Sequence, residues 1–246
     1  MQTGSLYAIY QTFYQPYEKT MIEDQPVFFF KFGSKEDMTD LLENGTIYFN
    51  TIDYFQKLEE QGLRGDNYEG TTNISNFHEY ESLTVTFTIL ETGKKITLRP
   101  RKFHLREFLK EIKGNIYSIY CLRPKDIIKN KDFKIDQRVK DFGTHFVLIK
   151  DVGRFLNQIY DELENIKMDY RTQQVQYYEK DRINGEISLF HKMKVFEYQN
   201  EFRIVLYNDE MEPKIIRIGA IKDYAEIFPV CALDDLDIKW NGRKLY

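Results

Sequence analysis

Residues 27–50 read VFFFKFGSKEDMTDLLENGTIYFN, and this stretch decides the start of the fold. The aromatic run of residues 27–32 predicts a buried strand, which Gly33 ends. Ser34 is a typical helix cap, so a helix is expected from there to Asn44, with Gly45 closing it. Residues 46–50 return to a strand pattern. The opening is therefore strand, helix, strand.

Further along the chain, similar patterns predict elements with short connections. Helices are expected around residues 52–58, at 101–113 and at 152–166. Strands are expected at residues 83–90, 95–98, 115–122, 145–150, 174–178, 202–207 and 214–218, and in the tail near residues 241–242. A long polar loop is expected at residues 61–75. Helices fall mainly in the first two thirds of the chain. This distribution predicts an α+β fold with a mixed or antiparallel sheet and helices packed on it.

One compact unit is expected, because the chain contains no internal repeat, Gly/Ser linker or Pro-rich stretch. We expect a single domain over residues 1–246, with residues 1–25 as an N-terminal extension and residues 208–246 as C-terminal strands. The content of 42% hydrophobic and 15% aromatic residues excludes a disordered chain.

The net charge of −4 and the isoelectric point near 5.7 leave no global basic field. Nonspecific binding to nucleic acid or to an anionic membrane is therefore not expected, and any anion site must be local. No run of 18 apolar residues occurs, and the first residues lack the pattern of a secretory signal. A cytoplasmic protein is expected.

Several common catalytic motifs are absent from the sequence. The four histidines show no metal-ligand spacing, so no metal is expected, and dinucleotide-fold, P-loop and hydrolase-elbow motifs do not occur. The two cysteines, Cys121 and Cys231, lie in apolar contexts, and both are expected to be buried and inert.

The late segment EYQNEFRIVL, residues 197–206, is the most informative for function. In a strand, alternation would place Glu197, Gln199, Glu201 and Arg203 on one face. The structural interpretation is a solvated sheet face with a Glu–Arg pair. The functional interpretation is a site at the mouth of the strand, with Glu201 as the essential carboxylate and Gln199 as its hydrogen-bonding partner.

A second candidate is the segment LRGDNYEGTT, residues 63–72. Gly65 and Gly70 permit a close backbone approach, and Asp66 and Glu69 between them could bind a hydroxyl-rich or cationic group of a ligand. An ordinary surface loop is the alternative.

Taken in order, these segments resemble a bacterial family that is called a domain of unknown function. Its members share an Asn-Asp-Pro-Phe-Glu-Gly-like loop, a mid-chain Cys-Phe-Ser-like strand and a late Tyr-x-x-Glu-Trp-Arg strand. The counterparts here are residues 30–32, 47–50, 65–70, 120–123 and 198–203.

That family more distantly resembles the ADP-ribosyltransferases, whose split sheet holds NAD⁺ in a central cleft. The resemblance implies that Glu201 stabilises positive charge on the ribose as nicotinamide leaves, and that Gln199 positions the acceptor. It implies Lys31 as the residue that holds the dinucleotide, with Tyr48 and Asn50 lining the cleft. Asp66, Glu69 and Arg203 complete the expected binding residues.

Two functions of different classes follow from these observations. The first is an enzyme that takes NAD⁺ or a related nucleotide as its substrate, transferring ADP-ribose or hydrolysing the glycosidic bond, as a toxin-like or phage-defence effector. The second is a non-catalytic module that uses the same cleft to bind a nucleotide or a protein. The expected partners are a small nucleotide and a macromolecular acceptor or regulatory protein.

Overall fold

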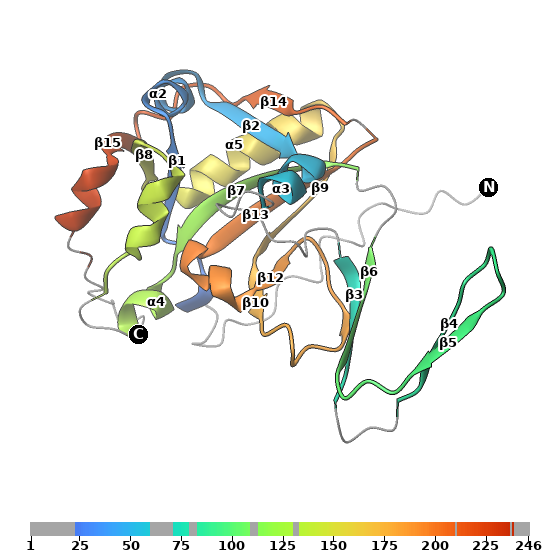
Figure 1. Ribbon diagram of the computed structural model, residues 1–246. Coiled ribbons are helices and arrows are strands. Elements are labelled where there is room, and N and C mark those ends of the chain that lie inside the picture. The colour runs from blue at the N-terminus through green and yellow to red at the C-terminus, as the bar shows by residue number, and fades with distance from the viewer. Residues whose placement is uncertain are drawn as a thin grey trace, which may run out of the picture.

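The computed structural model describes residues 23–59, 71–78, 83–108, 113–129, 133–209, 211–236 and 238 (Figure 1). In chain order, the elements are β1 (Phe28–Gly33), α2 (Lys35–Asn44), β2 (Thr46–Thr51), α3 (Ile52–Glu59), β3 (Thr71–Phe77), β4 (Val85–Thr88), β5 (Lys95–Leu98), β6 (Phe103–Phe108), β7 (Asn115–Leu122), α4 (Pro124–Ile128), η3 (Gln137–Phe142), β8 (His145–Ile149), α5 (Val152–Asn165), β9 (Asp169–Gln174), β10 (Gln176–Tyr178), β11 (Gly185–Glu186), β12 (His191–Met193), η4 (Lys194–Gln199), β13 (Glu201–Tyr207), β14 (Lys214–Arg217), β15 (Ala225–Pro229) and η5 (Val230–Asp234).

The main sheet has eight strands, and all the strand pairs within it are antiparallel. Its path runs β14-β2-β7-β1-β8-β15, while β13 pairs with both β7 and β9. Antiparallel sheets with helices packed against them confirm the predicted α+β class.

The sheet is split along one edge of β7. Because β13 occupies one edge of β7 from Asn115 to Tyr120, β1 and β2 must share the other edge. There β1 pairs with residues 120–122 and β2 with residues 115–116, so residues 117–119 pair with neither strand. Beyond these contacts β1 and β2 diverge, and α2 connects their far ends (Figure 1). A wedge-shaped opening results, bounded by β1, β2, β7 and α2.

Helix α5 covers one face of the main sheet (Figure 1). Its N-cap Asp151 accepts a hydrogen bond from the Arg154 amide at 2.9 Å. Phe155, Ile159 and Leu163 recur at helical spacing, and all three are fully buried in the main core. Each such side chain contributes about 1.5–3 kcal/mol by burial, so this face of the sheet is firmly covered.

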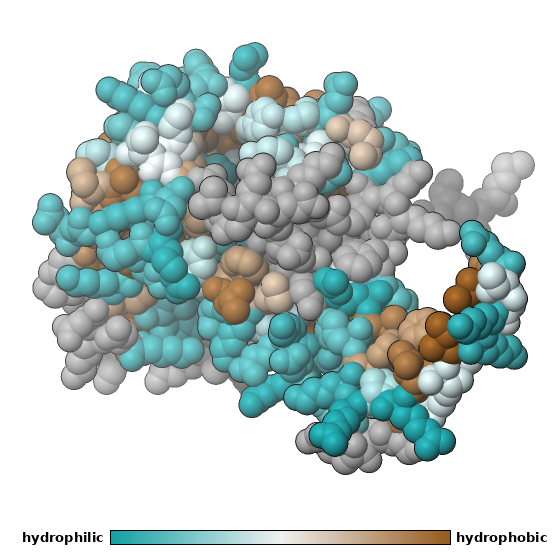
Figure 2. Space-filling model, in the orientation of Figure 1, coloured by the Kyte–Doolittle hydropathy of each residue, from teal (hydrophilic) through white to brown (hydrophobic). Residues whose placement is uncertain are grey.

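A β-ribbon of β4 and β5 projects from the body of the molecule (Figure 1). We call residues 85–98 the arm. In the described part of the chain, β4 and β5 pair only with each other. Apolar side chains lie exposed along one side of the arm, and Leu90 near its tip is 95% exposed (Figure 2).

Two predictions beside the arm are wrong. The helix expected at residues 101–113 is replaced by strand β6, and the end of the loop expected at 61–75 is strand β3. The two strands pair antiparallel, with Asn76 opposite His104. The spacing of Leu105, Phe108 and the later apolar residues fits a helix as well as a strand, and a pairing partner distant in sequence decides between them.

Smaller corrections concern the C-terminal third. The strand expected at 174–178 is interrupted at Val175 between β9 and β10, and strand β15 was not predicted. Cys231 is exposed, whereas Cys121 is buried as expected. The tail near residues 241–242 and residues 1–22 lie outside the described residues. No described helix has both the length and the apolar character needed to cross a membrane.

Candidate functional site

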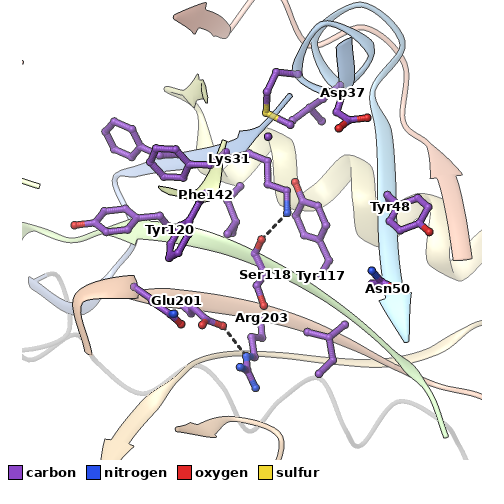
Figure 3. A pocket seen from close by; sticks show the side chains of 18 of the residues that line it. Lys31, Asp37, Tyr48, Asn50, Tyr117, Ser118, Tyr120, Phe142, Glu201 and Arg203 are labelled. Carbon is purple, nitrogen blue, oxygen red and sulfur yellow. Dashed lines mark hydrogen bonds and ion pairs between the residues drawn. The ribbon is translucent and has the colours of Figure 1, made fainter. Parts of the chain in front are cut away.

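The wedge contains a cavity of about 640 Å³, into which side chains from distant parts of the sequence converge (Figure 3). Six of the predicted site residues line it, namely Lys31, Tyr48, Asn50, Gln199, Glu201 and Arg203. The other two, Asp66 and Glu69, lie outside the described residues. The cavity therefore collects the predicted residues of β1, β2, η4 and β13.

The register of the sheet explains this convergence. Opposed residues of an antiparallel pair point to the same face. Glu201 lies opposite Tyr120, and Arg203 lies opposite Ser118. Asn50 lies opposite Ile116, which is on the same face of β7. The polar ends of β2 and β13 thus share the sheet face that is opposite to Ile119 and the α5 core.

Lys31 reaches into the gap between the diverging strands. Its Nζ donates a hydrogen bond to the Ser118 carbonyl oxygen at 2.8 Å. The same ammonium lies 4.1 Å from the centroid of the Tyr117 ring, within the range of a cation–π contact. The positive charge is consequently fixed at the stretch of β7 that neither β1 nor β2 pairs with.

Glu201 is held by two cations at the floor of the cavity. Its Oε1 accepts a hydrogen bond from Lys192 Nζ at 2.6 Å, and its Oε2 accepts one from Arg203 Nε at 2.8 Å. Lys192 also donates to Gln199 Oε1. The side chains of Lys192 and Arg203 are each 3% exposed and that of Glu201 is 9% exposed. This group of four polar side chains is called the floor network below.

The electrostatics of the floor network keep Glu201 ionised. Burial by itself raises the pKa of Glu201, but the charges of Arg203 and Lys192 and their hydrogen bonds more than offset that effect, so the pKa lies well below its usual range. Lys192, Arg203 and Lys31 bring three positively charged side chains to this part of the cavity, which favours a ligand with an anionic group.

The other walls of the cavity add aromatic and acidic groups. Tyr48 is 48% exposed and Tyr54 is 43% exposed, and both line the cavity. Asp37 of α2 lies on the side opposite the floor network (Figure 3), and Asp40 of α2 also lines the cavity. A ligand that carries both a flat ring and an anionic group would find complementary surfaces here.

Three features of the site differ from the expectations or were not predicted. Gln199 lies in the 3-10 helix η4 and not in the strand, because Asn200 makes a left-handed turn before β13 begins. Gln199 still lines the cavity. Lys192 was not predicted, since its segment shows no motif. Tyr117 was not predicted either, because a tyrosine in an apolar strand resembles a core residue.

Among the described residues, no group of three or more His, Cys, Asp or Glu side chains is placed to hold a metal ion. No family model, curated protein or solved structure matches the chain. The assignment of a function therefore depends on the geometry of the wedge.

Proposed function

We propose that this protein binds NAD⁺ or a related nucleotide in the wedge and acts on its glycosidic bond. The observation that supports this proposal is the convergence of six side chains on one cavity. The family resemblance of the sequence predicts all six as NAD⁺-site residues, and they come from four segments of the chain. A solvated sheet face with a Glu–Arg pair would not require Lys31 and Tyr48 at the same place.

The chemistry of the lining suits a nucleotide. Lys31 and the floor network supply positive charge for phosphate oxygens, and Tyr48 and Tyr54 supply ring faces on which a base can stack. Asn50 offers an amide that can donate to or accept from ribose or base. A cytoplasmic location, with a macromolecular acceptor or regulatory protein as a further partner, belongs to the same proposal.

In the enzymatic form of the proposal, Glu201 acts electrostatically. The bond between ribose C1′ and the nicotinamide nitrogen breaks, nicotinamide leaves with the bonding electrons, and C1′ becomes positively charged. Water or an acceptor then attacks C1′ and loses a proton. An ionised carboxylate fixed on both oxygens is a preorganised partner for that developing charge. The positive charges of Lys192 and Arg203 oppose this effect.

A second candidate function is a non-catalytic module that binds the same nucleotide. The observation that favours it is the double ion pairing of Glu201, because a carboxylate whose two oxygens already bind buried cations can serve to hold β13 in place. In that case the cavity senses the nucleotide without consuming it.

Nicotinamide release from NAD⁺ distinguishes the two functions. We expect release by the wild type, alone or with extract of phage-infected cells, and a loss on the order of 10² or more in Glu201→Gln while NAD⁺ binding is retained. Binding without release in any condition would leave the module as the function. Equal release by both proteins would exclude Glu201 as the catalytic group.

A further inference from the structure

Tyr117 lines the wedge cavity, and its hydroxyl is a buried donor. Tyr117 is 2% exposed, and its Oη has no hydrogen-bond partner among the described residues. Figure 3 shows the hydroxyl end of the ring beside the Lys31 ammonium, with both groups turned into the space between β1 and β2. A polar group of this kind is unusual, because nearly all buried polar atoms in folded proteins are hydrogen-bonded.

The surroundings of this hydroxyl define what it can bind. Burial raises the pKa of Tyr117 far above its ordinary value, so the group remains a neutral O–H donor. Its neighbour Lys31 is a cation that also donates hydrogen bonds. Two donors, one of them charged, attract an anionic oxygen and repel a cation.

We propose that Tyr117 Oη and Lys31 Nζ form a phosphate subsite in the wedge, at the part of β7 that neither β1 nor β2 pairs with. The inference rests on the proposed function in that the wedge is taken as the nucleotide site. It adds Tyr117 as a binding residue and places the phosphates of the ligand at Lys31. The nicotinamide ribose then extends from there toward Glu201, and the adenine extends toward Tyr48.

The subsite predicts that Tyr117→Phe has opposite effects on stability and on binding. Removing a donor that has no partner among the described residues should raise the melting temperature by about 2 °C or more. The same change should lower the affinity for NAD⁺ about tenfold or more, because a hydrogen bond to a charged oxygen is lost.

Tyr224→Phe is the matched control. Tyr224 is also a buried tyrosine, but its hydroxyl donates to Gln158 Oε1, and it is not part of the cavity lining. Its loss should lower the melting temperature and leave the affinity unchanged. If both tyrosine hydroxyls had a purely structural role, the melting temperatures of both variants would change in the same direction.

Calorimetric titrations with NAD⁺, pyrophosphate and adenosine test the subsite. We expect NAD⁺ and pyrophosphate to bind the wild type and to lose affinity in Tyr117→Phe, whereas binding of adenosine, which has no phosphate, does not change between the two proteins. Equal affinities of wild type and variant for NAD⁺ and pyrophosphate would overturn the subsite and leave the proposed function intact. Tyr117-dependent binding of pyrophosphate without binding of NAD⁺ would keep the subsite and refute the proposed ligand. If neither NAD⁺ nor pyrophosphate binds the wild type, the subsite is overturned.

Discussion

Glu201 combines burial with a negative charge, so its contribution to stability depends on Lys192 and Arg203. Moving a carboxylate out of water is costly, and the two cations compensate for that cost only while all three charges are present. The floor network therefore links the candidate catalytic group to the integrity of β13.

Replacing Glu201 by Gln removes the carboxylate that both buried cations bind. We expect the free energy of unfolding near neutral pH to fall by about 3–5 kcal/mol, a loss that a domain of ordinary stability survives. Urea denaturation measures this change. Glu226→Gln on β15 is the control, since Glu226 pairs with Lys150 at 2.6 Å but both side chains are about half exposed, and the expected change there is below about 1 kcal/mol. Similar losses in the two variants would contradict the account.

The difference in the free energy of unfolding between wild type and Glu201→Gln depends on pH, and the direction of this dependence can be predicted. The folded-state pKa of Glu201 lies below the ordinary value of 4.5, so its stabilising contribution is complete above that pH and declines as the pH falls below it. The gap in stability between wild type and Glu201→Gln should therefore narrow when denaturation is repeated at about pH 3. A gap that widens on acidification would refute the ion pairing.

Part of the site was predictable from the sequence because alternation along a strand is local. Glu201 and Arg203 line the same cavity, as alternation along a strand predicted, whereas Gln199 reaches it from the 3-10 helix η4. Lys192 could not be found in this way, since its contact with Glu201 depends on how β12 and η4 place it beneath β13. Tyr117 differs from a core tyrosine only in that its hydroxyl lacks a partner within the described part of the chain, which the sequence does not reveal.

The end of β1 is fixed by a contact between two glycines. A Cβ on Gly143 would lie 2.2 Å from the Gly33 carbonyl oxygen and 2.5 Å from the Gly33 nitrogen. Gly33 lines the cavity and is two residues from Lys31. Any side chain at position 143 must consequently displace the wall of the wedge.

Gly143→Ala should destabilise the protein by about 1–3 kcal/mol through this overpacking. Gly153→Ala in α5 is the control, because a Cβ there would meet only Asp151 Oδ1, at 3.7 Å, and alanine is the better helix former. That variant should gain about 0.5–1 kcal/mol. Thermal unfolding of both proteins is the measurement, and shifts of the same sign would be inconsistent with the close approach of β1.

Elements that carry their own boundary signals were predicted from the sequence. For α2, the Ser34 hydroxyl accepts a hydrogen bond from the Asp37 amide at 3.0 Å, and Gly45 adopts the left-handed conformation that ends a helix. Strands β3 and β6 lack such signals. Their pairing joins segments about thirty residues apart, so no local pattern could reveal it.

The arm is separate from the rest of the molecule in its packing. None of its residues belongs to the described hydrophobic clusters, and a two-stranded ribbon adds little stability by itself. Replacing residues 85–98 with a short Gly-Ser linker should change the free energy of unfolding by less than about 1 kcal/mol and leave NAD⁺ binding unaltered. Denaturation and calorimetry check both expectations, and a loss of NAD⁺ binding would show that the wedge is not self-contained.

The location of the nucleotide tests the central claim most directly. Photolabelling with 8-azido-NAD⁺, followed by peptide mapping, identifies the residues next to the bound base. Labelling that excess NAD⁺ suppresses and that maps to the cavity lining of β1, β2, α3 or β7 is the predicted result. Labelling outside the wedge, or labelling that NAD⁺ does not suppress, would contradict the account.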